Sequence, residues 1–152
     1  MISSINELTS DILGFDIGAA RIGVGRINPI ARLSEPLSPI VVKDSDPFKC
    51  INNLMTETSA SALVFGLPRN LNGDSTDQTR AVEKFVHSYI KENKPTIPVY
   101  FIDEAGTSKE ADQRIGKRTG ELSRDSVAAC IMLEDFVEQR DISRLLVSRS
   151  EN

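Results

Sequence analysis

The stretch Ile12-Leu13-Gly14-Phe15-Asp16-Ile17-Gly18-Ala19-Ala20-Arg21-Ile22-Gly23-Val24-Gly25 reads as two strands joined by a tight turn at Gly18. The first strand is apolar except for Asp16, which is typical of a strand covered on both faces. A lone carboxylate is costly to bury unless it is paired or binds a metal ion. Asp16 has an alternative role as a turn residue, but it precedes Ile17 and so lies inside the strand. We therefore predict that Asp16 belongs to a functional site.

The rest of the chain alternates between strand and helix patterns. Residues 21–27 predict a half-buried strand, and residues 30–42, interrupted by two prolines, predict an edge strand. The further predicted elements are a helix over 47–58, a buried strand over 62–65, a loop over 66–74, a helix from about 76, a strand over 98–102, a helix over 107–115, a loop over 116–120 and a helix over 125–139.

This order of elements predicts the fold class. An antiparallel start followed by alternating helices and strands indicates an α/β protein with helices on both faces of a mixed sheet. We expect a five-stranded sheet in the order 3-2-1-4-5, with strand 2 antiparallel. This is the order of the ribonuclease H-like fold.

Composition places the chain among ordinary globular proteins. Its 152 residues predict one ribonuclease H-like domain over 1–152, with a core at about 12–138 and a polar tail at about 140–152. The N-terminal residues show no signal-peptide pattern and no apolar run is long enough to cross a bilayer, so we expect a cytoplasmic protein without a membrane partner. The net charge of −4 does not suggest a protein that coats nucleic acid, although a metal site with a local basic patch needs no basic chain.

The cysteine and histidine content narrows the kinds of site. Cys50 and Cys130 lie far apart in apolar helical patterns and are expected to be buried thiols, neither a disulfide nor a redox pair. The single histidine, His87, has no neighbouring ligand pattern and is interpreted as an ordinary helix residue. This argues against a histidine-based zinc site and leaves a Ser-His-Asp triad only through His87.

Further acids stand at the ends of two other elements. Asp103 and Glu104 end an apolar strand, where sites of α/β proteins tend to lie, although a solvated strand end would look the same. Asp125 opens the last helix, where an aspartate can simply be an N-cap. Its spacing supports a second role, because Ala128 and Ala129 share its helix face. Two alanines there would let the helix approach the sheet and bring Asp125 to the acid of the first strand.

Carboxylates gathered in this way point to metal chemistry. They raise one another's pKa unless a cation is present. Mg²⁺ prefers oxygen ligands, and a pair of such ions can activate a water and stabilise the leaving oxygen of a phosphodiester. No general-base histidine is then required, which suits this chain.

Basic residues lie near these acids in the sequence. They are Arg21, Lys109, Arg114, Lys117, Arg118 and Arg124. Because acidic residues are interleaved with them, a charge-balanced solvated surface is the plain alternative. We expect Lys117, Arg118 and Arg124 to form a loop that contacts phosphates.

These motifs resemble the YqgF family, also called RuvX, of bacterial ribonuclease H-like proteins related to RuvC resolvase. Residues 16–25 resemble the first family motif and residues 65–73 its Gly-Leu-Pro-x-Asn loop. The match to the final helix rests on Asp125, Ala128, Ala129, Met132 and Leu133. The resemblance covers roughly residues 12–138 in the right order.

The resemblance implies a metal-dependent nuclease that uses Mg²⁺ or Mn²⁺. It is linked to maturation of the 5′ end of precursor 16S ribosomal RNA in ribosome biogenesis, and Holliday-junction resolution has been proposed for relatives. Asp16, Glu104 and Asp125 take the places of the catalytic, metal-binding acids, and Asp103 is the substitute for Glu104.

One position departs from the family pattern. Where the family has Arg after Asp-Glu, this chain has Ala105. A guanidinium at that point could hold a phosphate or orient Glu104, so its absence bears on activity and substrate choice. Arg69 stands where an apolar residue is more usual and is a candidate replacement. The residues expected to contact nucleic acid are Arg21, Arg69, Asn70, Lys117, Arg118 and Arg124.

Three functions remain open. The first is a metal-dependent endonuclease acting on structured RNA, free or in ribosomal precursor particles, as a monomer or homodimer. The second is a Holliday-junction resolvase, which should be a symmetric dimer. The third is a non-catalytic nucleic-acid or ribosome-assembly binder, favoured by Ala105 and the acidic balance. An actin-like ATPase would need two such domains, and the glycines do not form the Gly-x-Gly-x-x-Gly of dinucleotide binding.

Overall fold

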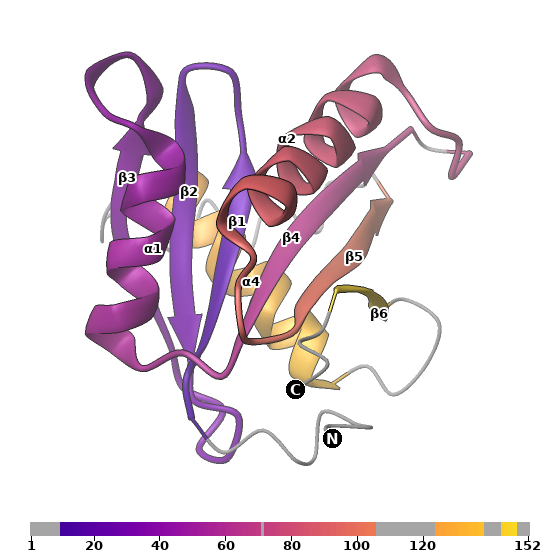
Figure 1. The fold of residues 1–152 in the computed structure, drawn as a ribbon. Helices are drawn as coiled ribbons and strands as arrows, with labels where there is room; N and C mark the ends of the chain where they lie inside the picture. Colours follow the sequence, from indigo (N-terminus) through magenta and orange to yellow (C-terminus); the bar gives the residue numbers. More distant parts are fainter. Residues whose placement is uncertain (1–9, 71, 106–123, 139–143, 149–152) are drawn as a thin grey trace.

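The fold is a six-stranded mixed sheet with helices on both faces, in the order β3-β2-β1-β4-β5-β6 (Figure 1). It is seen in a computed structural model that describes residues 10–70, 72–105, 124–138 and 144–148. The predicted order 3-2-1-4-5 is confirmed, and a sixth strand extends it beyond β5. The predicted helix over 107–115 and loop over 116–120 lie outside the described residues.

The N-terminal half of the sheet is an antiparallel meander. β1 (Ile12–Ile17) pairs with β2 (Arg21–Ile27), and β2 pairs with β3 (Ser34–Val41). The third strand begins later than the predicted residue 30. The Asn28 side chain accepts hydrogen bonds from the backbone N–H groups of Ile30 and Ala31, both at 2.9 Å, and closes a loop instead.

The C-terminal strands β4 (Ala62–Arg69) and β5 (Val99–Ala105) run parallel to β1. The loop predicted over 66–74 is partly wrong, because β4 continues to Arg69. Its last residues stay paired with β5, with Leu67 opposite Asp103 and Pro68 opposite Glu104. Those two acids are consequently part of a paired strand and not of a loose strand end.

Of the α-helices that the structure describes, α1 and α2 cover one face of the sheet and α4 covers the other (Figure 1). α1 (Pro47–Thr58) begins after its N-cap Asp46, and α2 (Asp77–Asn93) begins after the capping box of Thr76, which satisfies N–H groups of the first turn. Beneath them Phe15 and Phe65 stack with ring centroids 5.1 Å apart. The short helix η2 (Val42–Asp44) joins β3 to the segment before α1.

The opposite face is covered by α4 (Arg124–Glu138), which lies behind the sheet in Figure 1. Ile12, Val64, Leu133 and Phe136 belong to its buried cluster. β6 (Arg144–Ser148) pairs antiparallel with β5, so part of the tail predicted to be merely polar forms the edge of the sheet. Among the described residues, no helix is both long and apolar enough to span a bilayer.

The histidine lies on a helix, as the sequence suggested, and the expected burial of the thiols holds for one of the two. Cys130 is buried, Cys50 is only half-buried, and they do not form a disulfide with each other. His87 is exposed on α2, and its ring meets Phe101 edge-on at a centroid distance of 6.2 Å.

Candidate active site

Asp16 is held on the α4 face of β1. Side chains alternate along a strand, and Ile12 and Gly14 of the same set face α4, whereas Leu13 and Phe15 belong to the core beneath α1 and α2. Burial raises the pKa of the Asp16 carboxyl to about 6, and the negative charge of Asp125 adds to the rise. The carboxylate of Asp125, on the last helix, therefore acts electrostatically on Asp16.

Glu104 faces the same helix from β5. A Cβ added at Gly66 would lie 2.5 Å from its Oε2 and 2.8 Å from Met132 Sδ, so the carboxylate fits between β4 and α4. Burial raises the pKa of Glu104 to about 8, with further contributions from the charges of Asp16 and Asp135. Glu104 and Asp16 thus interact across β4.

Asp135 is the acid that the sequence reasoning missed. It is half-buried near the end of α4 and contributes to the raised pKa of Glu104. The signal was present, because Asp135 follows Met132 by three residues and therefore lies on the same helix face.

Asp125 lies in the first turn of α4. The helix begins at Arg124, so Asp125 is its second residue and not its N-cap. A carboxylate in the first turn interacts favourably with the helix dipole. The Arg21 Nε is 3.5 Å from Asp125 Oδ2, and both side chains are partly exposed. Arg21, expected to contact nucleic acid, therefore bridges the start of β2 to the acidic group.

Glycines of the sheet give α4 the room to approach. A Cβ at Gly23 would lie 2.1 Å from the backbone oxygen of Asp125, and one at Gly14 would lie 2.6 Å from Leu133 Cγ. Ser126 Oγ accepts a hydrogen bond from the Val24 backbone at 3.1 Å. The sequence reasoning attributed the close approach to small residues of the helix. The structure adds that small residues of β1 and β2 lie directly against the helix and leave room for it.

Asp103 lies on the other face of the sheet. It follows the alternation opposite to Glu104 and stands beside Leu67, which belongs to the core beneath α1 and α2. Its Oδ1 accepts a hydrogen bond from Arg69 Nε at 2.8 Å, and Arg69 also donates to Ser75 Oγ at 2.9 Å. The structure therefore separates Asp103 from the three acids and engages Arg69 in a local network.

The remaining expected nucleic-acid contacts are scattered. Arg124 is exposed at the start of α4, and Asn70 Oδ1 accepts hydrogen bonds from the backbone of Asn72 and Asp74, which shapes its loop. Lys117 and Arg118 lie outside the described residues.

The donor set suits a hard divalent cation. Asp16, Glu104 and Asp125 offer only carboxylate oxygens, the ligands that Mg²⁺ and Mn²⁺ favour. Burial first and neighbouring negative charge second raise the pKa values of Asp16 and Glu104, and a bound cation would favour the ionised form of both. Within the described ranges, no three such side chains are already close enough to enclose an ion. The residues fit the group by their oxygen-only chemistry and by their shared face of the sheet, and Asp16 is the acid whose charge interacts with both of the others.

Comparison with known proteins adds a family. The family model described as "RuvX: Holliday junction resolvase" matches residues 10–139. A protein of Roseiflexus sp. (strain RS-1) is 35% identical over 137 residues, covering 85% of this chain and 94% of the relative. One from Hydrogenovibrio crunogenus is 36% identical over 128 residues, covering 84% and 92%. Both relatives carry the name "Putative pre-16S rRNA nuclease".

Solved structures resemble the fold. The RuvC structure of Thermus thermophilus superposes with a TM-score of 0.55 at 15% identity, over 90% of this chain and 99% of that one. RuvC of the same organism in complex with a Holliday junction gives a TM-score of 0.52 at 16% identity, with the same coverage. At these identities the likeness concerns the architecture, and it confirms the ribonuclease H-like fold.

Proposed function

Because the chain belongs to the RuvX family, we propose that it is a metal-dependent endonuclease that trims the 5′ end of precursor 16S ribosomal RNA. The protein is a nuclease, a hydrolase of phosphodiester bonds, as its family and named relatives establish. The RNA substrate, its presentation on ribosomal precursor particles and a cytoplasmic location are our proposals. Relatives named for pre-16S rRNA cover most of this chain and support the choice of substrate.

One observation carries the proposal. Three carboxylates from β1, β5 and α4 face the same side of the sheet, and the Asp16 charge interacts with those of both Asp125 and Glu104. Such a group is unfavourable by itself and becomes favourable with a divalent cation. The metal dependence is part of our proposal, and it agrees with what the resemblance to the RuvX family implies.

Each residue has a distinct part in this proposal. Asp16, Glu104 and Asp125 would hold a pair of Mg²⁺ or Mn²⁺ ions, which supply an activated water and stabilise the leaving oxygen. Asp16, whose charge interacts with those of both other acids, would hold the ions together with them. Arg21 approaches Asp125 through one contact of 3.5 Å between Nε and Oδ2, and its guanidinium can turn to a phosphate of the substrate, which it could bind through two hydrogen bonds. Ala105 adds no cation beside Glu104, so Arg21 has a larger share of phosphate binding.

Cleavage of a labelled substrate panel tests the proposal. The panel holds precursor 16S RNA ends, a four-way DNA junction and plain duplexes, each with Mg²⁺, Mn²⁺ or EDTA. We expect metal-dependent cutting of the RNA end, reduced roughly 100-fold or more in Asp16→Asn because a shared metal ligand is lost. Glu92→Gln, an exposed acid-to-amide change on α2, is the matched control and should cut like wild type.

The outcomes separate the candidate functions. Cutting of RNA that survives Asp16→Asn would disprove the assigned site. If folded wild-type protein, checked by circular dichroism, binds RNA and cuts nothing, the protein is a binder that keeps the fold.

Holliday-junction resolution is the second candidate, because the matching family model carries that description. A resolvase must make two symmetric cuts and is therefore expected to be a dimer with two acidic groups. Preferred cutting of the four-way junction, together with a dimeric mass in sedimentation, would favour this function over RNA trimming.

A further inference from the structure

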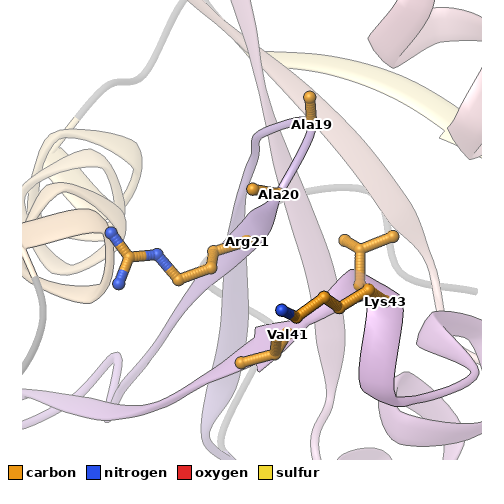
Figure 2. Close-up of a pocket in the computed structure, with 6 residues that line it drawn as sticks. Ala19, Ala20, Arg21, Val41 and Lys43 are labelled. Atoms are coloured by element: carbon orange, nitrogen blue, oxygen red, sulfur yellow. The ribbon is translucent and has the colours of Figure 1, made fainter.

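A pocket of about 460 Å³ lies beside the acidic group, at the end of the sheet where β1 turns into β2 (Figure 2). Its lining is formed by Ala19, Ala20, Arg21, Val41, Val42 and Lys43. Four of these side chains are small and aliphatic, two are cationic and none is acidic. A volume of this size is within the range of roughly 300–1,000 Å³ typical of small-ligand sites.

The pocket and the acids share one residue. Arg21 pairs with Val41 across the β2–β3 ladder, so both side chains project from the same face of the sheet, the face that α4 covers. Figure 2 shows the Arg21 side chain directed toward α4, where its Nε meets Asp125 at 3.5 Å. A nucleic-acid strand bound at the three acids would therefore pass Arg21 before it reaches the pocket.

Lys43 supplies a second cation on the far side. Its side chain extends over Val41 toward β2 in Figure 2. Within the described ranges, no carboxylate forms an ion pair with Lys43, whereas Arg26, Arg69 and Arg80 each have at least one acidic partner. The Lys43 ammonium is thus available to an anion from outside the protein.

The chemistry of the pocket matches that of one nucleotide. The aliphatic floor offers apolar surface to the flat face of a base or to a ribose, and the two cations flank the place for its phosphate. A base inside such a recess cannot stay stacked or paired, so the occupant must belong to an unpaired stretch of strand.

We propose that this pocket binds one unpaired nucleotide next to the phosphodiester that is cut, with its phosphate between Arg21 and Lys43. The inference rests on the nuclease function proposed above and adds to it a preference for single-stranded flanks. The pocket would fix the register of the cut by seating a nucleotide at a set distance from Asp125.

A double-mutant cycle between protein and substrate tests the pocket. Substrates carry a single abasic nucleotide at each position around the cut, and the variants are Ala19→Leu, which fills the pocket, and Lys43→Ala. The matched controls are Ala81→Leu and Lys91→Ala, at exposed positions of α2. The readouts are kcat/KM for cleavage, and Kd by fluorescence anisotropy in the Asp16→Asn background.

At one position next to the cut, we expect the abasic substitution to lower wild-type kcat/KM and affinity roughly 5- to 30-fold, the loss of one stacked base. Ala19→Leu should lower both by a similar factor on intact substrate, and the abasic change should then cost little more. Lys43→Ala should weaken binding with a smaller salt dependence.

Two results would overturn the inference without touching the nuclease assignment. One result is that the abasic substitution and Ala19→Leu act independently, so that their fold-reductions in kcat/KM multiply at every position, while cutting still depends on Asp16. The other is an equal effect of Ala81→Leu. If wild type cuts nothing, the nuclease proposal fails, and the same cycle on Kd still decides whether the pocket seats a nucleotide.

Discussion

Among the described acids, Glu104 has the pKa that is raised furthest from its ordinary value. Its pKa of about 8 and that of Asp16, about 6, are raised by burial first and by neighbouring negative charge second. At pH 7 and without metal, Asp16 is largely ionised and Glu104 largely protonated. Cation binding must therefore release the Glu104 proton, and apparent metal affinity should rise with pH between 6 and 8.

The same shifts predict how the metal-free protein responds to pH. In the unfolded chain these acids ionise near their ordinary pKa values of 3.8 and 4.5, so between there and pH 8 the folded protein binds more protons. Stability therefore falls as pH rises. In EDTA we expect the Tm to drop on the order of 5 °C from pH 6 to pH 8, and Glu104→Gln to reduce that drop.

Differential scanning calorimetry at both pH values measures the effect, with Glu92→Gln as the control. Parallel pH dependence of wild type and Glu104→Gln would contradict the assignment of the raised pKa. Addition of Mg²⁺ at pH 8 should restore the Tm of wild type and leave Glu104→Gln nearly unchanged.

Arg69 links the ends of two strands to the loop before α2. Removing it in Arg69→Ala leaves Asp103 without its partner, and we expect a loss of about 1–2 kcal/mol in the free energy of unfolding. Asp103→Ala should cost a similar amount, and the double variant little more, in urea titration. If Arg69 also contacts a phosphate, as its position in the loop motif suggests, Arg69→Ala should raise KM for cleavage more than Asp103→Ala does. Equal KM values would limit Arg69 to its structural role.

At the scale of elements, the contact between α4 and the sheet places the acids. The helix backbone touches β2 at Gly23, its Leu133 fills the space over Gly14, and Ser126 accepts the hydrogen bond of Val24. A helix held this closely carries Asp125 to Asp16 with little freedom. Its position depends on the absence of side chains on the strands beneath it.

Gly23→Ala tests this contact. The new Cβ would lie 2.1 Å from the Asp125 backbone oxygen, which no side-chain rotation can relieve, so the first turn of α4 must move. We expect a destabilisation of about 1–3 kcal/mol and a loss of cleavage larger than the loss of folded protein. Gly25→Ala, whose Cβ would meet Cys130 at 3.0 Å, should be milder. A fully active and stable Gly23→Ala protein would show that α4 does not hold Asp125 by this contact.

At the scale of the whole molecule, β6 protects the edge of the strand that carries Glu104. It pairs with Val99–Ile102, and Asp103, Glu104 and Ala105 pair with β4 on the other side of the strand. Edge strands with free N–H and C=O groups are prone to association. The described strand β6 therefore supports the part of β5 that precedes the acids.

A chain that ends at residue 143 should separate stability from activity. Loss of the β6 hydrogen bonds is expected to lower the free energy of unfolding by about 2 kcal/mol or more and to promote aggregation, as measured by urea unfolding and light scattering. Cleavage per folded molecule should stay within about twofold of wild type, because the acids keep their strands. A chain that ends at residue 148 is the control. If cleavage falls by more than unfolding and aggregation together explain, β6 contributes to the active site.

Local patterns in the sequence were sufficient for most of the fold. Alternation over 21–27, the apolar run around Asp16 and the caps before α1 and α2 each depend on neighbours a few residues apart, and the strand order followed from them. Asp16 could be recognised as exceptional for the same reason, since a carboxylate inside an apolar strand is visible within six residues. Strand β6 was missed because its partner β5 lies more than forty residues away in the chain and its apolar run, Leu145 to Val147, is only three residues long between polar and basic neighbours.

The choice among the acids required the folded molecule. Asp103 and Glu104 are equivalent as neighbours in sequence, and their separation depends on which face of β5 α4 covers. Likewise, the role of Asp135, the link from Arg21 to Asp125 and the recess beside Ala19 arise where segments distant in sequence meet. Periodicity assigns a residue to one of the two faces of a strand, but only tertiary packing determines what each face contacts. Burial and charge repulsion, which shift the pKa values of the acids, arise only once that packing has formed.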